Sequence, residues 1–181
     1  MKRTTFDAYI RLHRRMWLDM CKEITRKKHP IDVYQFKYNW IYKNKTHAMN
    51  SCFLCECANI LRDEADNENS DSMIQHTSKG LSCRYCPCIW SSNGDNNHEY
   101  MCEYNHDYNN KHFGHGLWMI ADNIYGVYSD LLEMTEILNC ELPQESKRKV
   151  DKLWRKQCKI CFKIAMLPVR DDLDYMITES L

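Results

Sequence analysis

Two short stretches with the same cysteine spacing constrain this chain more than any other feature of its sequence. CFLCEC (residues 52–57) and CRYCPC (residues 83–88) both follow the pattern C-x-x-C-x-C. A C-x-x-C turn places two sulfur atoms on one side of a metal ion, and a structural zinc ion takes four such ligands in a tetrahedron. The sequence therefore predicts one Zn²⁺ ion, held by Cys52, Cys55, Cys83 and Cys86.

The compartment also favours a metal over disulfide bonds. The first residues, MKRTTFDAYIRLHRR, lack the apolar run of a signal peptide. No stretch approaches the roughly 20 apolar residues of a membrane span. We therefore expect a cytoplasmic protein with no membrane contact. In that reducing compartment, paired cysteines bind metals more often than they form disulfides.

The chain has eleven cysteines, so more than one arrangement stays open. Cys57 and Cys88 repeat the offset of the two pairs, and Cys102 follows them. Six cysteines could hold two zinc ions through shared sulfurs, or an iron–sulfur cluster, and Cys102 could replace one of the four ligands. We expect Cys57 and Cys88 instead to be small buried residues beside the site. Four buried free thiols are the alternative to any metal.

Hydrophobic spacing predicts a mainly α protein. Residues 4–28 form an amphipathic pattern that ends before Pro30. Residues 31–42 are rich in aromatics and favour a second helix, although their alternation also fits a strand. Residues 117–142 carry apolar side chains at steps of four and three, and Pro143 ends that pattern. A further helix is predicted from a cap at Ser146 to Leu167, packed antiparallel to the one before it.

These patterns divide one domain, residues 1–181, into four parts. We expect N-terminal helices in residues 1–45, a Cys/His-rich zinc-binding segment in 46–116, a helical hairpin in 117–168 and an acidic tail in 169–181. The middle segment has no sustained period, and RDEADNENSDS (residues 62–72) has the composition of a loop. Zinc would stabilise this irregular centre between the helical arm and the hairpin.

No pattern of catalytic residues stands out. The run NNHEYMCEYNHDYNNKHFGHG contains His98 and His106, and with the paired cysteines it suggests the HNH nucleases. The Asp-His and Asn-His spacing of those enzymes is missing, and a deaminase would need H-x-E with P-C-x-x-C. We therefore expect no enzyme, with an HNH-like nuclease as the weaker alternative.

The charge of the chain is zero in total but uneven along it. Residues 2–28 and 145–163 are basic, and residues 145–163 hold eight Lys or Arg against two acids. Such a helix could contact nucleic acid or an acidic protein surface, or could be a solvated face. The C-x-x-C of Cys158 and Cys161 lies inside this helix, so we expect core packing there and no redox pair.

The order of motifs resembles that of small cysteine-rich proteins encoded by tailed bacteriophages. The shared features are CFLCECA, CRYCPCIW, a later cysteine and a final helix with KIAMLPVR, over roughly half the chain. The resemblance implies Cys52, Cys55, Cys83 and Cys86 as metal ligands, although Cys57 and Cys88 stand where that family usually has other residues. It implies a viral accessory protein in the bacterial host cytoplasm. We expect it to bind and inhibit or redirect a host defence or transcription complex, or alternatively to bind nucleic acid.

Overall fold

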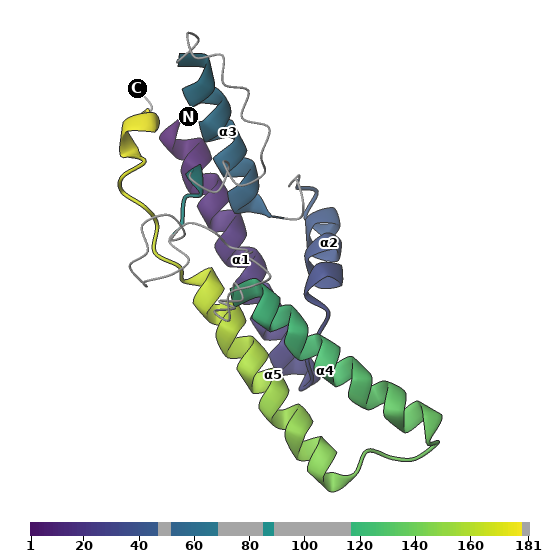
Figure 1. Cartoon of the computed structure of the whole chain (residues 1–181). Coiled ribbons are helices and arrows are strands. Elements are labelled where there is room, and N and C mark those ends of the chain that lie inside the picture. Colours follow the sequence, from purple (N-terminus) through teal and green to yellow (C-terminus); the bar gives the residue numbers. More distant parts are fainter. Residues whose placement is uncertain (47–51, 69–84, 89–116, 179–181) are drawn as a thin grey trace, which may run out of the picture.

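The computed structural model describes residues 1–46, 52–68, 85–88 and 117–178 (Figure 1). Within these ranges the chain forms five α-helices and a short 3-10 turn. They are α1 (Arg3–Lys27), α2 (Val33–Lys43), α3 (Phe53–Glu68), α4 (Leu117–Ile137), α5 (Gln144–Ala165) and the turn Asp174–Met176. The described residues form two isolated β-bridges and no strand. The prediction of a mainly α protein is confirmed for this part of the chain.

The centre of the fold is the packing of α1 against α5 (Figure 1). One face of α1 is buried along its length: Phe6, Ile10, His13, Met16, Trp17, Met20, Cys21 and Ile24. His13 contacts the main chain of Ile164, and Cys21 contacts that of Cys158, so the two helices run antiparallel. Full burial stabilises each large apolar side chain by about 1.5–3 kcal/mol relative to exposure. This stripe, predicted from the sequence, therefore supplies much of the core.

The α4–α5 hairpin is confirmed, but its turn lies earlier than predicted. α4 ends at Ile137, and Asn139 takes a positive φ of 46° in the connection that follows. α5 begins at Gln144, with Pro143 as the residue before its first turn and no side-chain cap. Ser146 lies inside the helix, so the predicted cap at this position is wrong. Pro143 is the residue before the helix, with an extended ψ of 153°, and it has no N–H that would need a partner at this helix end.

The expectation of an irregular segment over residues 46–116 is wrong for residues 53–68, which form α3. Its buried residues recur at helical spacing: Phe53, Leu54, Cys57, Ala58 and Leu61. Phe53 packs edge-on against Trp40 of α2, at 5.8 Å between ring centroids. The acidic run predicted as a loop continues this helix to Glu68, and its remainder lies outside the described residues.

The C-terminal segment, which we expected to be an acidic tail, packs onto the fold over its described residues. Leu173 and Ile177 are buried, and Thr178 pairs with Lys2 in a parallel bridge. The amino group of Met1 is paired with the carboxylate of Glu64 in α3. The two ends of the described chain and α3 therefore lie together (Figure 1).

Candidate metal centre

The first cysteine pair lies at the start of α3. Cys52 immediately precedes the helix, and its carbonyl accepts the N–H of Glu56 at 3.2 Å. The Cys52 and Cys55 thiols are hydrogen-bonded to each other. This hydrogen bond is the main reason that the pKa of Cys52 is lowered to about 6, against the opposing effect of burial. The Lys37 charge and the N–H groups of Cys55 and Leu54 lower it further. The lowered pKa of Cys52 favours its thiolate, the form of cysteine that binds metals.

Lys37 is a buried cation that the sequence did not reveal. It belongs to α2, and its ammonium group lies 5.8 Å from the ring centre of Trp17 and 5.7 Å from that of Trp118. Contact with the faces of two indole rings stabilises a cation away from water. Lys37 thus supplies positive charge near Cys52. The aromatic richness of residues 31–42 was the available signal, but the two rings come from α1 and α4.

The second cysteine triplet is described only over residues 85–88, where it lies against the C-terminal segment. Cys88 forms an antiparallel bridge with Val169. The N–H of Arg170 donates to the Pro87 carbonyl at 3.0 Å, and its guanidinium donates to the Cys86 carbonyl at 3.3 Å. Sequence reasoning missed this role of Arg170.

The guanidinium of Arg170 is buried and also binds Asp172, with nitrogen–oxygen distances of 2.8 and 2.6 Å. The hydrogen bond from Arg170 holds the pKa of the Asp172 carboxyl below its usual range. Asp172 therefore remains charged and orients the arginine that holds the second triplet.

Cys57 and Cys88 are buried, as predicted. Burial, followed by the charge of Cys88, raises the pKa of Cys57 to about 12. Burial also raises the pKa of Cys88 to about 12, with Arg14 acting against it and Cys52 adding to it. Cys57 and Cys88 belong to the same buried core, and the partly buried Cys52 packs against that core. The Cys57 thiol donates to the sulfur of Met1 at 3.9 Å.

The predicted zinc ligands are only partly brought together by the described residues. Cys52 and Cys55 form a pair with thiolate character, which fits one half of a tetrahedral site. In the described ranges, no three His, Cys, Asp or Glu side chains form a group that could hold a metal ion. Cys83 lies outside those ranges, as do Cys102, His98 and His106.

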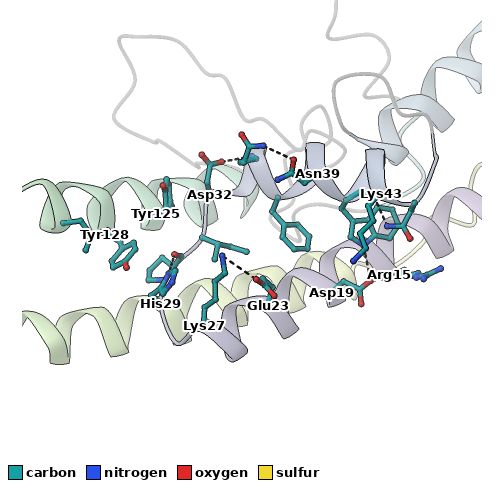
Figure 2. Close-up of a pocket in the computed structure, with 17 residues that line it drawn as sticks. Arg15, Asp19, Glu23, Lys27, His29, Asp32, Asn39, Lys43, Tyr125 and Tyr128 are labelled. Atoms are coloured by element: carbon teal, nitrogen blue, oxygen red, sulfur yellow. Dashed lines mark hydrogen bonds and ion pairs between the residues drawn. The ribbon is translucent and has the colours of Figure 1, made fainter.

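A second concave region lies between α1, α2 and α4 (Figure 2). On its α1 side, Asp19 accepts the indole N–H of Trp40 at 3.1 Å, and Glu23 pairs with Lys27 at 3.5 Å. At its other end, His29 stacks on Tyr128 with 5.1 Å between ring centroids. Asp19 and Glu23 are thus engaged with neighbouring side chains of the protein. We therefore interpret this cleft as the place where three helices meet, and not as a ligand site.

Comparisons with protein-family models, curated proteins and solved structures find no match for this chain. In the part of the chain that the structure describes, no helix has the length and apolar character needed to cross a membrane. Function therefore has to be inferred from the chemistry and surface of this chain alone.

Proposed function

We propose that this protein is a zinc-binding interaction protein that engages a host macromolecule and inhibits or redirects it. A defence or transcription complex of a bacterial host is the partner class implied by the resemblance to phage proteins. The observation that carries the proposal is the exposed apolar surface at the far end of the α4–α5 hairpin. This end projects beyond α1 and α2 (Figure 1).

The exposed surface has the spacing of a helix–helix contact. Val127, Leu131, Met134 and Leu138 follow one another at steps of four, three and four, as in a coiled-coil seam. Leu131 is half-buried, whereas Val127, Met134 and Leu138 are 39%, 58% and 65% exposed. Ile137 beside them is 73% exposed. Clustered apolar side chains of this kind mark protein-binding surfaces, and helical anchors at such steps suit an apolar groove or a partner helix.

The metal has a structural role in this proposal. Zn²⁺ would join Cys52 and Cys55 at the start of α3 to Cys83 and Cys86 of the second triplet. Because α3 packs on α1 and the second triplet packs on Arg170, the ion would tie the middle of the chain to both ends. In this proposal the metal ion cross-links the two cysteine pairs and takes no part in a reaction.

Metal content tests the zinc site directly. We expect one zinc ion per purified chain by elemental mass spectrometry, and loss of that zinc in Cys52→Ser and in Cys83→Ser. Cys140 is exposed in the connection after α4, so Cys140→Ser is the matched control and should retain the metal. A fully folded, zinc-free chain whose melting is unchanged by a chelator contradicts the site.

Partner capture tests the binding surface. The double variant Val127→Glu/Met134→Glu places charge on the seam, and it should lose a partner that the natural protein retains from bacterial lysate at physiological salt. Phe162, 52% exposed on α5 away from the hairpin end, offers the control Phe162→Glu, which should keep the partner. Equal retention by both variants, or no stable partner for the natural protein, overturns the proposal.

Nucleic-acid binding is a second candidate, favoured by the charge of α5. The eight basic residues of this helix are all exposed: Lys147, Arg148, Lys149, Lys152, Arg155, Lys156, Lys159 and Lys163. Two of them already have acidic partners, since Arg155 pairs with Asp151 and Lys147 with Glu141. Phosphate-driven binding weakens steeply with salt. Gel shifts across a salt series therefore separate the two candidates, because a protein partner held by the apolar seam should be far less sensitive.

A further inference from the structure

A second cysteine cluster, separate from the candidate metal centre, lies between α1 and α5. The thiol of Cys21 donates to the carbonyl of Cys158 at 3.4 Å, and the thiol of Cys158 donates to the carbonyl of Cys21 at 3.8 Å. The reciprocal thiol-to-carbonyl contacts show that Cys21 and Cys158 face each other across the helix interface.

The three thiols differ in their access to solvent. Cys158 is partly exposed, and its sulfur lies 3.7 Å from the hydroxyl oxygen of Thr25 at the protein surface. Cys161 is fully buried, and its thiol donates to the sulfur of Met20 at 3.6 Å. Cys21 lies between these extremes, at 9% exposure. A small solute can therefore reach the Cys21–Cys158 side of the cluster but not Cys161.

The thiols also differ in acidity. Hydrogen bonding from Cys161, and then from Cys158, lowers the pKa of Cys21 against the effect of burial. Burial raises the pKa of Cys158, and the hydrogen bond to Cys21 and burial raise that of Cys161. Cys21 is accordingly the member of the cluster that ionises most readily, and the thiolate is the reactive form of cysteine.

We propose that Cys21 and Cys158 form an oxidisable dithiol site, in which a small hydroperoxide joins α1 to α5 through a disulfide bond. The Cys21 thiolate attacks the peroxide, the O–O bond breaks, and the released alkoxide takes a proton to leave as an alcohol, or as water when the oxidant is hydrogen peroxide. Cys21 is then a sulfenic acid. The sulfur of Cys158 displaces its hydroxyl, which leaves as water with the Cys158 proton. Two thiols and one peroxide thus give one disulfide, one alcohol and one water.

Cys158, and not Cys161, is the partner because of position. Cys158 lies opposite Cys21 on the facing helix, whereas the Cys161 thiol is directed to Met20 in the core. Cys158 and Cys161 are also unsuited to pair with each other, since both belong to the middle of one helix. The residues that would be joined are separated by 137 positions in the sequence. A cross-link over such a distance restricts the unfolded chain and stabilises the folded one.

Peptide mapping of the full-length protein tests the site. The purified chain is treated with a small excess of hydrogen peroxide, blocked with N-ethylmaleimide and digested with trypsin without reduction. Cleavage after Lys159 separates Cys158 from Cys161, because the expected peptides are QCK and ICFK, and Cys21 lies in MWLDMCK. We expect MWLDMCK cross-linked to QCK, together with a rise in the thermal midpoint that dithiothreitol reverses. Peptides from the candidate metal centre are distinct, so oxidation there is scored separately.

Single substitutions decide the pairing. Cys158→Ser should abolish the cross-link and the rise in midpoint, and Cys158→Ala serves the same purpose should the serine variant fold poorly. Cys161→Ser and Cys140→Ser should retain both. The proposal is overturned when peroxide oxidises exposed Cys140 while Cys21 is recovered as the maleimide adduct. It is equally overturned when the natural protein gives MWLDMCK joined to ICFK as its main product.

Discussion

The two ends of the α4–α5 hairpin both carry apolar side chains at helical spacing, but their surroundings differ. At the inner end, one face of α5 from Gln157 onward is buried between α1, α4 and the segment at Ile31. At the outer end, Met134 and Ile137 of α4 remain exposed in the described part of the chain. Apolar side chains recur at helical spacing in both. Helical periodicity therefore identifies an apolar face of a helix. Packing against a third helix decides whether that face stabilises the fold or remains available for a partner.

Gln157 gives the largest expected effect, because it holds the inner end together. Its amide accepts the Ile31 N–H at 3.0 Å and donates to the carbonyls of Ile31 and Ala121 at 2.8 and 2.9 Å. Gln157→Leu keeps the volume but leaves the buried N–H and carbonyl of Ile31 unsatisfied, and it removes the second hydrogen bond of the Ala121 carbonyl, which lies within α4. We expect a loss of about 3–5 kcal/mol in the free energy of unfolding, measured by urea denaturation.

Gln144 is the matched control, since it lies at the exposed start of the same helix. Gln144→Leu should change the free energy of unfolding by less than about 0.5 kcal/mol. Similar costs for the two substitutions would remove the distinction between the inner and outer ends.

Lowering the pH should reduce the free energy of unfolding by a somewhat smaller amount, through His13 at the inner end. Burial lowers the pKa of His13 to about 4; the Lys37 and Arg14 charges lower it too, and the hydrogen bond to Ile164 acts in the opposite direction. Between its unfolded pKa of about 6.5 and this value, the unfolded chain takes up a proton that the folded chain does not. Stability should therefore be complete above pH 6.5 and should fall by about 3 kcal/mol as the pH is lowered to 4.

The measurement is a series of urea titrations between pH 7 and pH 4. His13→Gln keeps a donor for the Ile164 carbonyl, at 3.0 Å from the ring nitrogen in the natural protein, but cannot titrate. The free energy of unfolding of this variant should therefore lack the loss of about 3 kcal/mol that the natural protein shows between pH 6.5 and pH 4. A natural protein whose stability is flat from pH 6.5 to 4 contradicts the buried neutral histidine.

The outer end gives the smallest expected effect on stability. Met134 and Ile137 are 58% and 73% exposed, so Met134→Ser/Ile137→Ser removes little buried surface. We expect a change of about 0.5 kcal/mol or less in the free energy of unfolding. Ile164 is fully buried on α5, and Ile164→Ala should cost about 2–5 kcal/mol in the same assay. A large loss from the serine variant would show that the outer end is part of the core.

The helical framework was largely predictable from the sequence, because each helix that was predicted has its own apolar spacing and a nearby proline. α3 was missed, since its helical spacing at Phe53, Leu54 and Leu61 coincides with the cysteines of the first triplet. Those cysteines were interpreted as a loop motif, although Cys52 only precedes the helix and Cys55 and Cys57 lie inside it.

The candidate zinc site was predicted by motif alone, and the structure adds the environment of its described half. The pairing of Cys52 with Cys55 follows from their spacing of three residues. The low pKa of Cys52 could not be foreseen, because it depends in part on Lys37 of another helix. The support of Cys86 and Pro87 by Arg170 was equally hidden, because these residues are more than eighty positions apart.

By itself, the sequence determined where the main helices lie and which of their faces are apolar, because both depend on residues within a few positions of one another. Only the tertiary structure decided which cysteines meet. CFLC and CKIC have the same spacing, yet Cys52 faces Cys55 at the start of α3, whereas Cys158 faces Cys21 of α1. A thiol's reactivity is set by the groups within a few ångströms of the sulfur, and packing brings those groups from distant parts of the chain.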